Sequence, residues 1–280
     1  PPTAARRAAR MTLKKLTERL AAAGIEDAAF DAAQLICHAC AVSRAALMCD
    51  RDKNYDSPLL ESLAMRREQG EPLQYILGEW EFMGLRIKVG PECLIPRADT
   101  EVLAQFAIDN LPRGGRFADL CTGSGCIAAA VLAFRQDVSG AAAELYPETL
   151  EIARENAEAL HVSERLELIC ADVTRDCLAG EFDMIVANPP YIAASEMPKL
   201  SREVMHEPRA ALTDGGDGLS VIKSIIDIYP DRLRQGGTLA VEIGWRQGQA
   251  VSEYAEGRGL KARVLKDGGG RDRVVCMQAK

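Results

Sequence analysis

One stretch decides the fold, and it reads Arg116-Phe117-Ala118-Asp119-Leu120-Cys121-Thr122-Gly123-Ser124-Gly125, followed at once by the apolar run 126–134. Residues 116–120 have the pattern of a short buried strand, and 126–134 is long and apolar enough for a helix. Gly123 and Gly125 let the backbone of the connecting turn approach a ligand closely, and the first turn of a helix has free N–H groups. The stretch therefore predicts a strand, a tight turn and a helix that can cradle an anion or a carboxylate.

Strand and helix patterns alternate along the chain on both sides of this turn. We expect further strands at 141–144, 166–170, 182–187 and 237–243, and helices at 100–108, 147–160 and 221–233. The segments 263–265 and 274–277 predict a closing antiparallel pair. Alternation of this length is typical of a doubly wound, mainly parallel α/β sheet. In such sheets ligands bind at the carboxyl ends of the strands, near the point where the strand order switches.

The first part of the chain has a helical pattern instead. Apolar residues recur at helical spacing from Leu13 to Leu20, and Ser43 and Ser57 stand where helix N-caps are expected. An alternating apolar run broken by a glycine, at 80–89, predicts a β-hairpin. The expected domains are a helical recognition domain at 1–75, a hairpin linker at 76–96 and a catalytic domain at 97–280.

The composition favours a cytoplasmic protein that does not bind nucleic acid directly. Of the 280 residues, 48% are hydrophobic and 27% are charged, and the net charge is −7. Proteins that bind duplex DNA usually carry a basic surplus, because their affinity comes largely from neutralised phosphates. No apolar stretch is long enough to span a bilayer, and no apolar signal-peptide core follows the charged start, so no membrane partner is expected.

The nine cysteines are expected to be reduced thiols in such a compartment. Cys37 and Cys40 are spaced like half of a zinc site, with His38 between them, but no second pair with this spacing follows. We therefore expect no metal, and we interpret Cys37 and Cys40 as helix residues that face a core.

Two acidic residues follow predicted strands and complete a pocket with the glycine turn. Glu144 lies about 20 residues beyond that turn, where a carboxylate can accept both hydroxyls of a ribose. Asp172 can accept from the exocyclic amine of a purine, with Val173 against the ring. Together with Cys121-Thr122-Gly123-Ser124-Gly125 these residues describe a nucleoside pocket. The pocket does not distinguish S-adenosylmethionine (SAM) from a nicotinamide dinucleotide.

The segment Asn188-Pro189-Pro190-Tyr191 follows the strand predicted at 182–187 and favours methyl transfer. The two prolines remove two N–H donors, which leaves the Pro189 carbonyl as an acceptor, and the Asn188 side-chain oxygen is a second acceptor. These acceptors can hold an –NH2 group with its nitrogen aimed at a methyl donor, and Tyr191 offers a ring face to a planar group. Hydride transfer has no use for this arrangement. An amide and an aromatic amine both remain possible substrates.

Several further segments accompany this motif along the chain: Gly70-Glu71-Pro72-Leu73-Gln74-Tyr75-Ile76-Leu77-Gly78, Glu81-Phe82-x-Gly84, Leu94-Ile95-Pro96-Arg97 with Thr100-Glu101, Glu207-Pro208-Arg209-Ala210-Ala211-Leu212, Gly215-Gly216-x-Gly218-Leu219, and Glu242-Ile243-Gly244 with Gln247. With these segments the chain closely resembles the release-factor glutamine methyltransferases over nearly its whole length. The resemblance implies a Rossmann-like, SAM-dependent methyltransferase domain with a small N-terminal helical domain.

The resemblance also implies a substrate and a set of roles. The substrate would be the glutamine of the Gly-Gly-Gln loop in class 1 peptide chain release factors, methylated on its side-chain amide nitrogen (N5) by an enzyme that acts as a monomer. By position, Cys121–Gly125, Glu144 and Val173 would line SAM, and Asn188–Tyr191 would hold the glutamine amide, with Asn188 also near SAM.

Three positions depart from the family pattern. Cys121 stands where the family has glycine, which raises the question of whether this position needs a positive φ angle. Glu144 replaces the usual aspartate and is one methylene longer, and Ala98 stands where proline is common. None of the three removes a group that the proposed chemistry uses.

Three other functions are compatible with parts of this pattern. An adenine-N6 DNA methyltransferase uses the same four-residue motif, but the acidic charge and the segment 95–101 disfavour it. A glutamine methyltransferase that acts on a ribosomal protein is closer, and the linker segment 70–78 favours release factors over it. A non-catalytic SAM-sensing protein is disfavoured by the intact Asn188 and Tyr191.

Overall fold

The chain forms two compact units in the computed structural model, which describes residues 11–279. The first unit holds the described residues up to Gly78 together with Arg202–His206, and the second holds Glu79–Ser201 and the described residues from Glu207 onward. A short segment that follows the Asn-Pro-Pro-Tyr motif therefore packs as part of the first unit.

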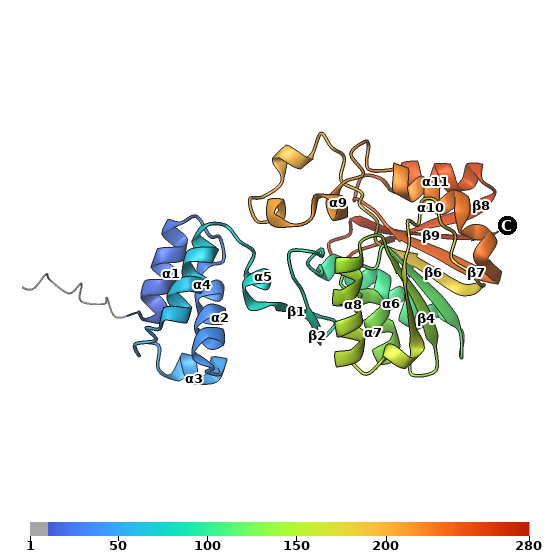
Figure 1. Cartoon of the computed structure of the whole chain (residues 1–280). Helices are drawn as coiled ribbons and strands as arrows, with labels where there is room; N and C mark the ends of the chain where they lie inside the picture. The colour runs from blue at the N-terminus through green and yellow to red at the C-terminus, as the bar shows by residue number, and fades with distance from the viewer. Residues whose placement is uncertain (1–10, 280) are drawn as a thin grey trace, which may run out of the picture. The chain divides into compact units, whose positions relative to one another are not determined.

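The first unit is helical (Figure 1). Its helices are α1 (Leu13–Ala22), α2 (Ala28–Cys40), α3 (Arg44–Cys49), α4 (Pro58–Glu68) and α5 (Leu73–Leu77). The side chains of Thr12, Ser43 and Ser57 cap α1, α3 and α4 by accepting a backbone N–H each, which satisfies donors that have no partner inside the helix. Helix α5 had not been expected, and it ends at Gly78 with a φ of 78°.

Two ion pairs of the buried Arg67 join elements of this unit. The Arg67 guanidinium donates from Nε to Asp31 at 2.6 Å and also pairs with Glu203 of the segment Arg202–His206. Both Arg67 and Asp31 are almost fully buried. Breaking such a pair by removing one partner strands a charge in the core, so Arg67 fixes the later segment to the helices.

The second unit begins with a hairpin of β1 (Glu79–Phe82) and β2 (Leu85–Lys88). Its main sheet has seven strands in the order β5-β4-β3-β6-β7-β9-β8. The bounds are β3 (Arg116–Leu120), β4 (Ser139–Glu144), β5 (Leu166–Cys170), β6 (Phe182–Ala187), β7 (Leu233–Glu242), β8 (Leu260–Lys266) and β9 (Asp272–Ala279). Strands β3 to β7 are parallel, and β9 runs antiparallel to both of its neighbours. The expected doubly wound α/β sheet is confirmed.

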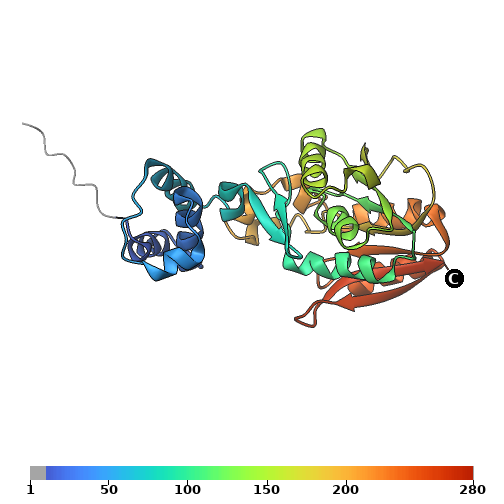
Figure 2. The same cartoon turned by 90° about the horizontal axis from the view of Figure 1, so that it is seen from below.

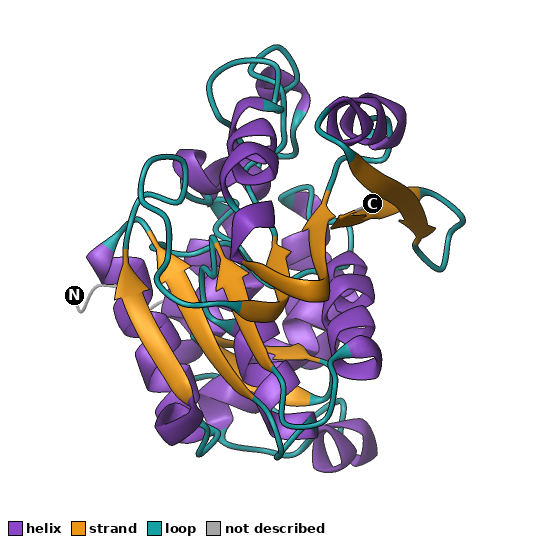
Figure 3. Ribbon diagram, turned by 90° about the vertical axis from the view of Figure 1, so that its right-hand side faces the viewer, coloured by secondary structure: helices purple, strands orange, loops and turns teal. Residues whose placement is uncertain are grey.

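Helices cover both faces of this sheet (Figure 3). One layer contains α6 (Glu101–Asn110), α7 (Cys126–Phe134) and α8 (Pro147–Ala159), and the other contains α10 (Ser220–Ile228) and α11 (Gly248–Gly257) (Figure 1). Side chains alternate along each strand between these layers. Ile222, Ile225 and Val251 pack on the strand residues that face α10 and α11. The closing pair β8 and β9 forms a long hairpin at one edge of the sheet (Figure 2).

The remaining elements are short. They are α9 (Arg209–Leu212) and the 3-10 helices η1 (Ala98–Thr100), η2 (Ser163–Arg165), η3 (Met197–Lys199), η4 (Val204–His206) and η5 (Pro230–Arg232).

Several elements differ from the sequence-based prediction. The helix predicted at 221–233 ends at Ile228, because Pro230 has no N–H to continue it, and β7 begins at Leu233 instead of residue 237. Helix α11 had not been predicted, although Val251 and Ala255 lie four residues apart on its buried side. Its glycine ends and polar middle give a weak helical signal.

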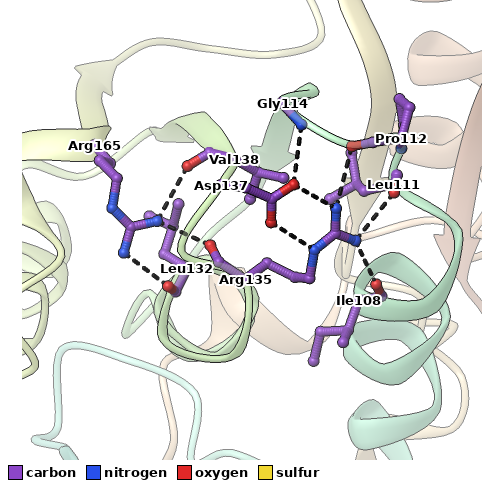
Figure 4. Close-up of polar contacts among 9 residues, drawn as sticks. All are labelled: Ile108, Leu111, Pro112, Gly114, Leu132, Arg135, Asp137, Val138 and Arg165. Atoms are coloured by element: carbon purple, nitrogen blue, oxygen red, sulfur yellow. Dashed lines mark hydrogen bonds and ion pairs between the residues drawn. The ribbon is translucent and has the colours of Figure 1, made fainter.

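Arginines close the end of the sheet where the parallel strands begin (Figure 4). Arg165, just before β5, donates to the carbonyls of Leu132 at 2.8 Å, Arg135 at 2.9 Å and Val138 at 3.1 Å. Two of these are carbonyls at the end of α7, where no further helical N–H is available. Arg135 in turn donates to the carbonyls of Ile108 and Leu111 at the end of α6.

Because these arginines lie at the opposite end of the strands from their carboxyl ends, we expect a change at Arg165 to lower stability without affecting function. The change Arg165→Ala should lower the free energy of unfolding by about 1–3 kcal/mol, because it leaves helix carbonyls without their charged donor. Thermal unfolding measures this loss, and the exposed Arg113, changed to alanine, is the matched control. An Arg165→Ala protein as stable as the Arg113→Ala protein would contradict the capping role.

Candidate active site

A cavity of about 370 Å³ opens at the carboxyl ends of the parallel strands of the second unit. This volume lies in the range of small-molecule and cofactor sites, roughly 300–1,000 Å³. The predicted site residues that line it are Cys121, Thr122, Gly123, Ser124, Glu144, Asp172, Val173, Asn188 and Pro190. Gly125, Pro189 and Tyr191, also predicted, are not among the lining residues. One cavity therefore collects residues from four strand ends.

Strand register brings these residues together. Leu120 at the end of β3 pairs with Ala143 of β4 on one side and with Ala187 of β6 on the other. The residues that follow, Cys121, Glu144 and Asn188, therefore emerge side by side at one edge. The strand order switches between β3 and β6, and this is the position where ligands bind in open α/β sheets.

Asp119 shapes the glycine turn from below. Its Oδ2 accepts from the Thr122 hydroxyl at 2.6 Å and from the Ala128 N–H, in the first turn of α7, at 3.2 Å. The side chain is fully buried, and burial raises the pKa of Asp119 to about 7 although both of these donors oppose the shift. Asp119 thus links the strand, the turn and the helix that the opening stretch of the sequence predicts.

The backbone of the turn is left-handed at three positions. Cys121 has a φ of 57°, Gly123 of 56° and Gly125 of 76°. A side chain at Gly125 would press on Ala153 of α8, so glycine is needed there for space as well as for φ. The position of Cys121, where the resembling family has glycine, does adopt a positive φ, and Cys121 occupies it at the cost of some backbone strain. Burial raises the pKa of the Cys121 thiol, which keeps it protonated.

Glu144 is held at the end of β4 by backbone donors. Its Oε2 accepts from the Gly123 N–H at 3.0 Å, and its Oε1 accepts from the N–H groups of Leu145 at 2.9 Å and Tyr146 at 3.3 Å. Burial raises the pKa of Glu144, and the three N–H donors oppose this shift. The carboxylate is thus fixed at the cavity wall, and Oε2, which accepts a single hydrogen bond, has a further lone pair for a ligand hydroxyl.

Asp172 and Val173 lie beyond the end of β5. The Asp172 Oδ1 accepts from the hydroxyl of Thr174 at 2.6 Å and from its N–H at 3.0 Å, and the Thr174 hydroxyl lowers the pKa of Asp172. Val173 is buried and presents an apolar wall to the cavity. An ionised acceptor beside an apolar wall suits a heteroaromatic base that has an amine.

Asn188 has a defined amide orientation. Its Nδ2 donates to the Thr100 hydroxyl oxygen at 3.3 Å, and the residue lines the cavity. With the nitrogen engaged by Thr100, the carbonyl oxygen of the Asn188 side chain is the group available to a ligand. Thr100 itself is buried at the end of η1. The site therefore presents a hydrogen-bond acceptor at the start of the Asn-Pro-Pro-Tyr segment.

Tyr191 is anchored at its two ends. Its hydroxyl donates to Glu242 Oε1 at 3.1 Å, and its carbonyl accepts from Gln247 Nε2 at 2.9 Å. Burial is the main cause that raises the pKa of Tyr191, and the adjacent Glu242 carboxylate adds to it. Gly218 lies so close to the Tyr191 carbonyl that a side chain there would collide with it. These contacts fix the path of the chain after the two prolines.

Sequence reasoning assigned no role to several residues that shape the site. Glu207, buried beside the cavity, pairs with Arg97 and accepts from the Ile95 N–H at 3.1 Å. Glu242 is another such residue, and its position as a charged residue at the end of an apolar strand is a sequence signal that could have identified it.

The part of the chain that the structure describes contains neither a cluster of metal ligands nor a helix that could span a membrane. No group of three or more histidine, cysteine or acidic side chains within residues 11–279 is arranged to hold a metal ion. Over the same residues, no helix has both the length and the apolar character that crossing a membrane requires.

Comparison with known proteins finds a matching family for each of two parts of the chain. Residues 98–241 match the Methyltransferase small domain family, and residues 12–78 match the PrmC N-terminal domain family. A methyltransferase of known structure from Pyrococcus furiosus superposes with a TM-score of 0.55 at 19% identity, over 71% of this chain and 91% of that one. This likeness supports the fold of the second unit.

Two curated relatives cover nearly the whole length. The release factor glutamine methyltransferase of Cereibacter sphaeroides is 42% identical over 94% of this chain and 95% of its own. The release factor glutamine methyltransferase of Vibrio cholerae is 39% identical over 96% of each chain. Identity at this level over both units is far more specific than a shared fold, and the chain belongs to the release factor glutamine methyltransferase family.

Proposed function

We propose that this chain transfers a methyl group from SAM to the side-chain amide nitrogen of the glutamine in the Gly-Gly-Gln loop of class 1 peptide chain release factors. The observation that carries the proposal is the Asn188 amide, whose nitrogen is bound to Thr100 so that its oxygen is left as an acceptor beside the cavity. The full-length similarity to release factor glutamine methyltransferases supports the choice of substrate.

The residues of the cavity fit SAM. The first turn of α7, where Cys126 and Ile127 line the cavity, offers backbone N–H groups for the carboxylate of the methionine part. Glu144 would accept from a ribose hydroxyl through Oε2, and Asp172 and Val173 would receive the adenine. When bound, SAM supplies a methyl group on a positively charged sulfur. The acidic residues that line the cavity, among them Glu144 and Asp172, suit that charge.

Asn188 and Pro189 would hold the substrate amide. Its two N–H groups would donate to the Asn188 side-chain oxygen and the Pro189 carbonyl, which orients the nitrogen and favours the electron-rich form that reacts. The new carbon–nitrogen bond forms as the carbon–sulfur bond breaks. The N–H becomes acidic during this step, so the proton can pass to water without a strong base in the site.

The amide of glutamine is a weak nucleophile, so positioning is the main contribution that the protein can make. Well-oriented intramolecular reactions gain roughly 7–11 kcal/mol from proximity and orientation. The site has the features for this effect, since Asn188 is oriented by Thr100 and Tyr191 is anchored at its hydroxyl and its carbonyl. In this proposal the partner is the release factor, and the chain acts as a monomer without nucleic acid or a membrane.

Labelled SAM tests the substrate directly. The protein is incubated with a class 1 release factor, with the same factor carrying a Gln→Ala change in its Gly-Gly-Gln loop, with ribosomal proteins and with DNA. Label is expected on the unchanged release factor alone. Label on DNA or on a ribosomal protein, with none on the release factor, would overturn the proposal.

The acceptor role of Asn188 leads to a mutational prediction. Asn188→Ala should lower the turnover number by about 10²–10³-fold, as loss of one oriented polar group commonly does, while the affinity for SAM stays near that of the wild type. Turnover is measured with the release factor, and SAM binding by calorimetry. Asn110→Ala, on the exposed end of α6, is the matched control. Turnover like that of the wild type in Asn188→Ala would refute the role.

The position of Glu144 leads to another prediction. Glu144→Ala should raise the Kd for SAM by about tenfold or more, since 1.4 kcal/mol of lost interaction corresponds to a factor of ten. Glu144→Asp keeps the carboxylate and should retain most of the affinity. Calorimetry with SAM checks both variants, and an unchanged Kd in Glu144→Ala would rule out a ribose contact.

A further inference from the structure

Glu242 is a buried acid at the end of an otherwise apolar strand. It is 1% exposed, and it follows Leu239, Ala240 and Val241 of β7, which are fully buried. Val241 pairs with Ala187 of β6, so Glu242 lies next to Asn188 at the carboxyl edge of the sheet. An ionisable group in such a place is costly and calls for an explanation.

Glu242 contacts both ends of the Asn-Pro-Pro-Tyr segment, one directly and one through Thr100. The Tyr191 hydroxyl donates to Glu242 Oε1 at 3.1 Å. The Thr100 hydroxyl lies near the same carboxylate and lowers its pKa. The Thr100 oxygen accepts from Asn188 Nδ2 at 3.3 Å. A chain of polar contacts thus runs from Glu242 to the amide that lines the cavity.

The charges around Glu242 only partly offset its burial. Arg273 of β9 lowers the pKa of Glu242 and Asp99 of η1 raises it, but burial dominates and raises the pKa to about 7. Arg273 is itself shared with Asp99 at 2.8 Å and Asp267 at 3.2 Å. Within residues 11–279, Glu242 Oε2 has no hydrogen-bond partner. The acid is therefore kept at this position at a cost in stability, which is typical of functional sites.

The donors and acceptors in the chain of contacts have a fixed direction. Above a pH of about 7 the Glu242 carboxyl is ionised and only accepts hydrogen bonds, so the nearby Thr100 hydroxyl directs its hydrogen toward Glu242. The Thr100 oxygen then has only lone pairs to offer, and Asn188 must turn its –NH2 group toward Thr100. The Asn188 oxygen is consequently left for the ligand. Without Glu242, the Thr100 hydroxyl can turn its hydrogen toward Asn188, and the amide can flip.

We propose that Glu242 is a positioning residue for the methyl transfer, and that it acts through Thr100 to hold the Asn188 oxygen toward the substrate amide and through Tyr191 to fix the segment that follows. This inference rests on the proposed function, because it assigns the amide acceptor to Asn188. Glu242 is not among the residues that line the cavity, so it acts through the residues that do.

The change Glu242→Gln tests the inference, because glutamine has the same shape but can donate to Thr100. The turnover number should fall on the order of 10- to 100-fold, as for other groups that orient a site residue, and the Kd for SAM should stay within about twofold. The midpoint of thermal unfolding should stay equal or rise at pH 8. The pKa of Glu242 is higher in the folded protein than in the unfolded chain, so protonated Glu242 stabilises the fold at pH values below the pKa of the unfolded chain. This stabilisation is lost as the pH rises through about 7, and at pH 8 the ionised acid is unfavourable.

Two sets of variants make this result specific. Thr100→Ser keeps the hydroxyl and should keep most activity, whereas Thr100→Val should lose activity. When Glu242→Gln is added to the Thr100→Val protein, it should lower turnover much less than it does in the wild type. Glu253→Gln, an exposed residue on α11, is the matched change and should have no effect.

The outcomes separate the two proposals. Wild-type turnover in Glu242→Gln would overturn the positioning role, and so would a parallel fall in turnover, SAM affinity and unfolding midpoint, which indicates a purely structural residue. A wild-type protein that leaves the release factor unlabelled and labels another glutamine substrate overturns the proposed function alone. The same variants then test Glu242 on that substrate.

Discussion

The pairing of β3 with two neighbours is the constraint on which the rest of the structure depends. Leu120 of β3 pairs in register with Ala143 of β4 and with Ala187 of β6. The sheet continues from β3 through β4 to β5 on one side and through β6 to β7 on the other. Because parallel strands end at one edge, the glycine turn, Glu144 and Asn188 are forced to share one cavity. A shift of one residue in either register would turn alternate side chains to the opposite face and separate these groups.

Three buried acids stand behind this edge, and each one holds a loop in place. Asp119 binds the glycine turn and the start of α7, Glu144 binds the turn and the backbone that follows β4, and Glu242 binds Tyr191. A buried carboxylate accepts several hydrogen bonds in a medium of low dielectric constant, where each is stronger than in water. These acids hold the loops in place, but burying an ionisable group lowers the stability of the fold. Such an arrangement is consistent with a site whose contribution to the reaction is positioning.

The sequence-based prediction was correct where local signals agree and wrong where they are weak. Alternating strand and helix patterns predicted the sheet, and the helix predicted at 221–233 was too long because apolar residues continue past Ile228 into the strand that begins at Leu233. Helix α11 was missed since its composition is polar, and it becomes a helix because Val251 and Ala255 pack on the sheet. The hydrogen bond of the Tyr191 hydroxyl to Glu242 is a contact that no sequence signal predicted.

The sequence by itself determined the class of the fold, the family and the residue types of the site, because periodicity, glycine turns and the Asn-Pro-Pro-Tyr segment are local features. Only the tertiary structure decided which groups those residues contact. Glu242 lies 54 positions after Asn188 along the chain, and Thr100 lies 88 positions before it. The hydrogen bonds of Asn188 to Thr100 and of Tyr191 to Glu242 exist because sheet register and the position of η1 bring these residues together, and no local pattern encodes such contacts. The orientation of the Asn188 amide, on which the proposed chemistry depends, is for that reason a property of the fold.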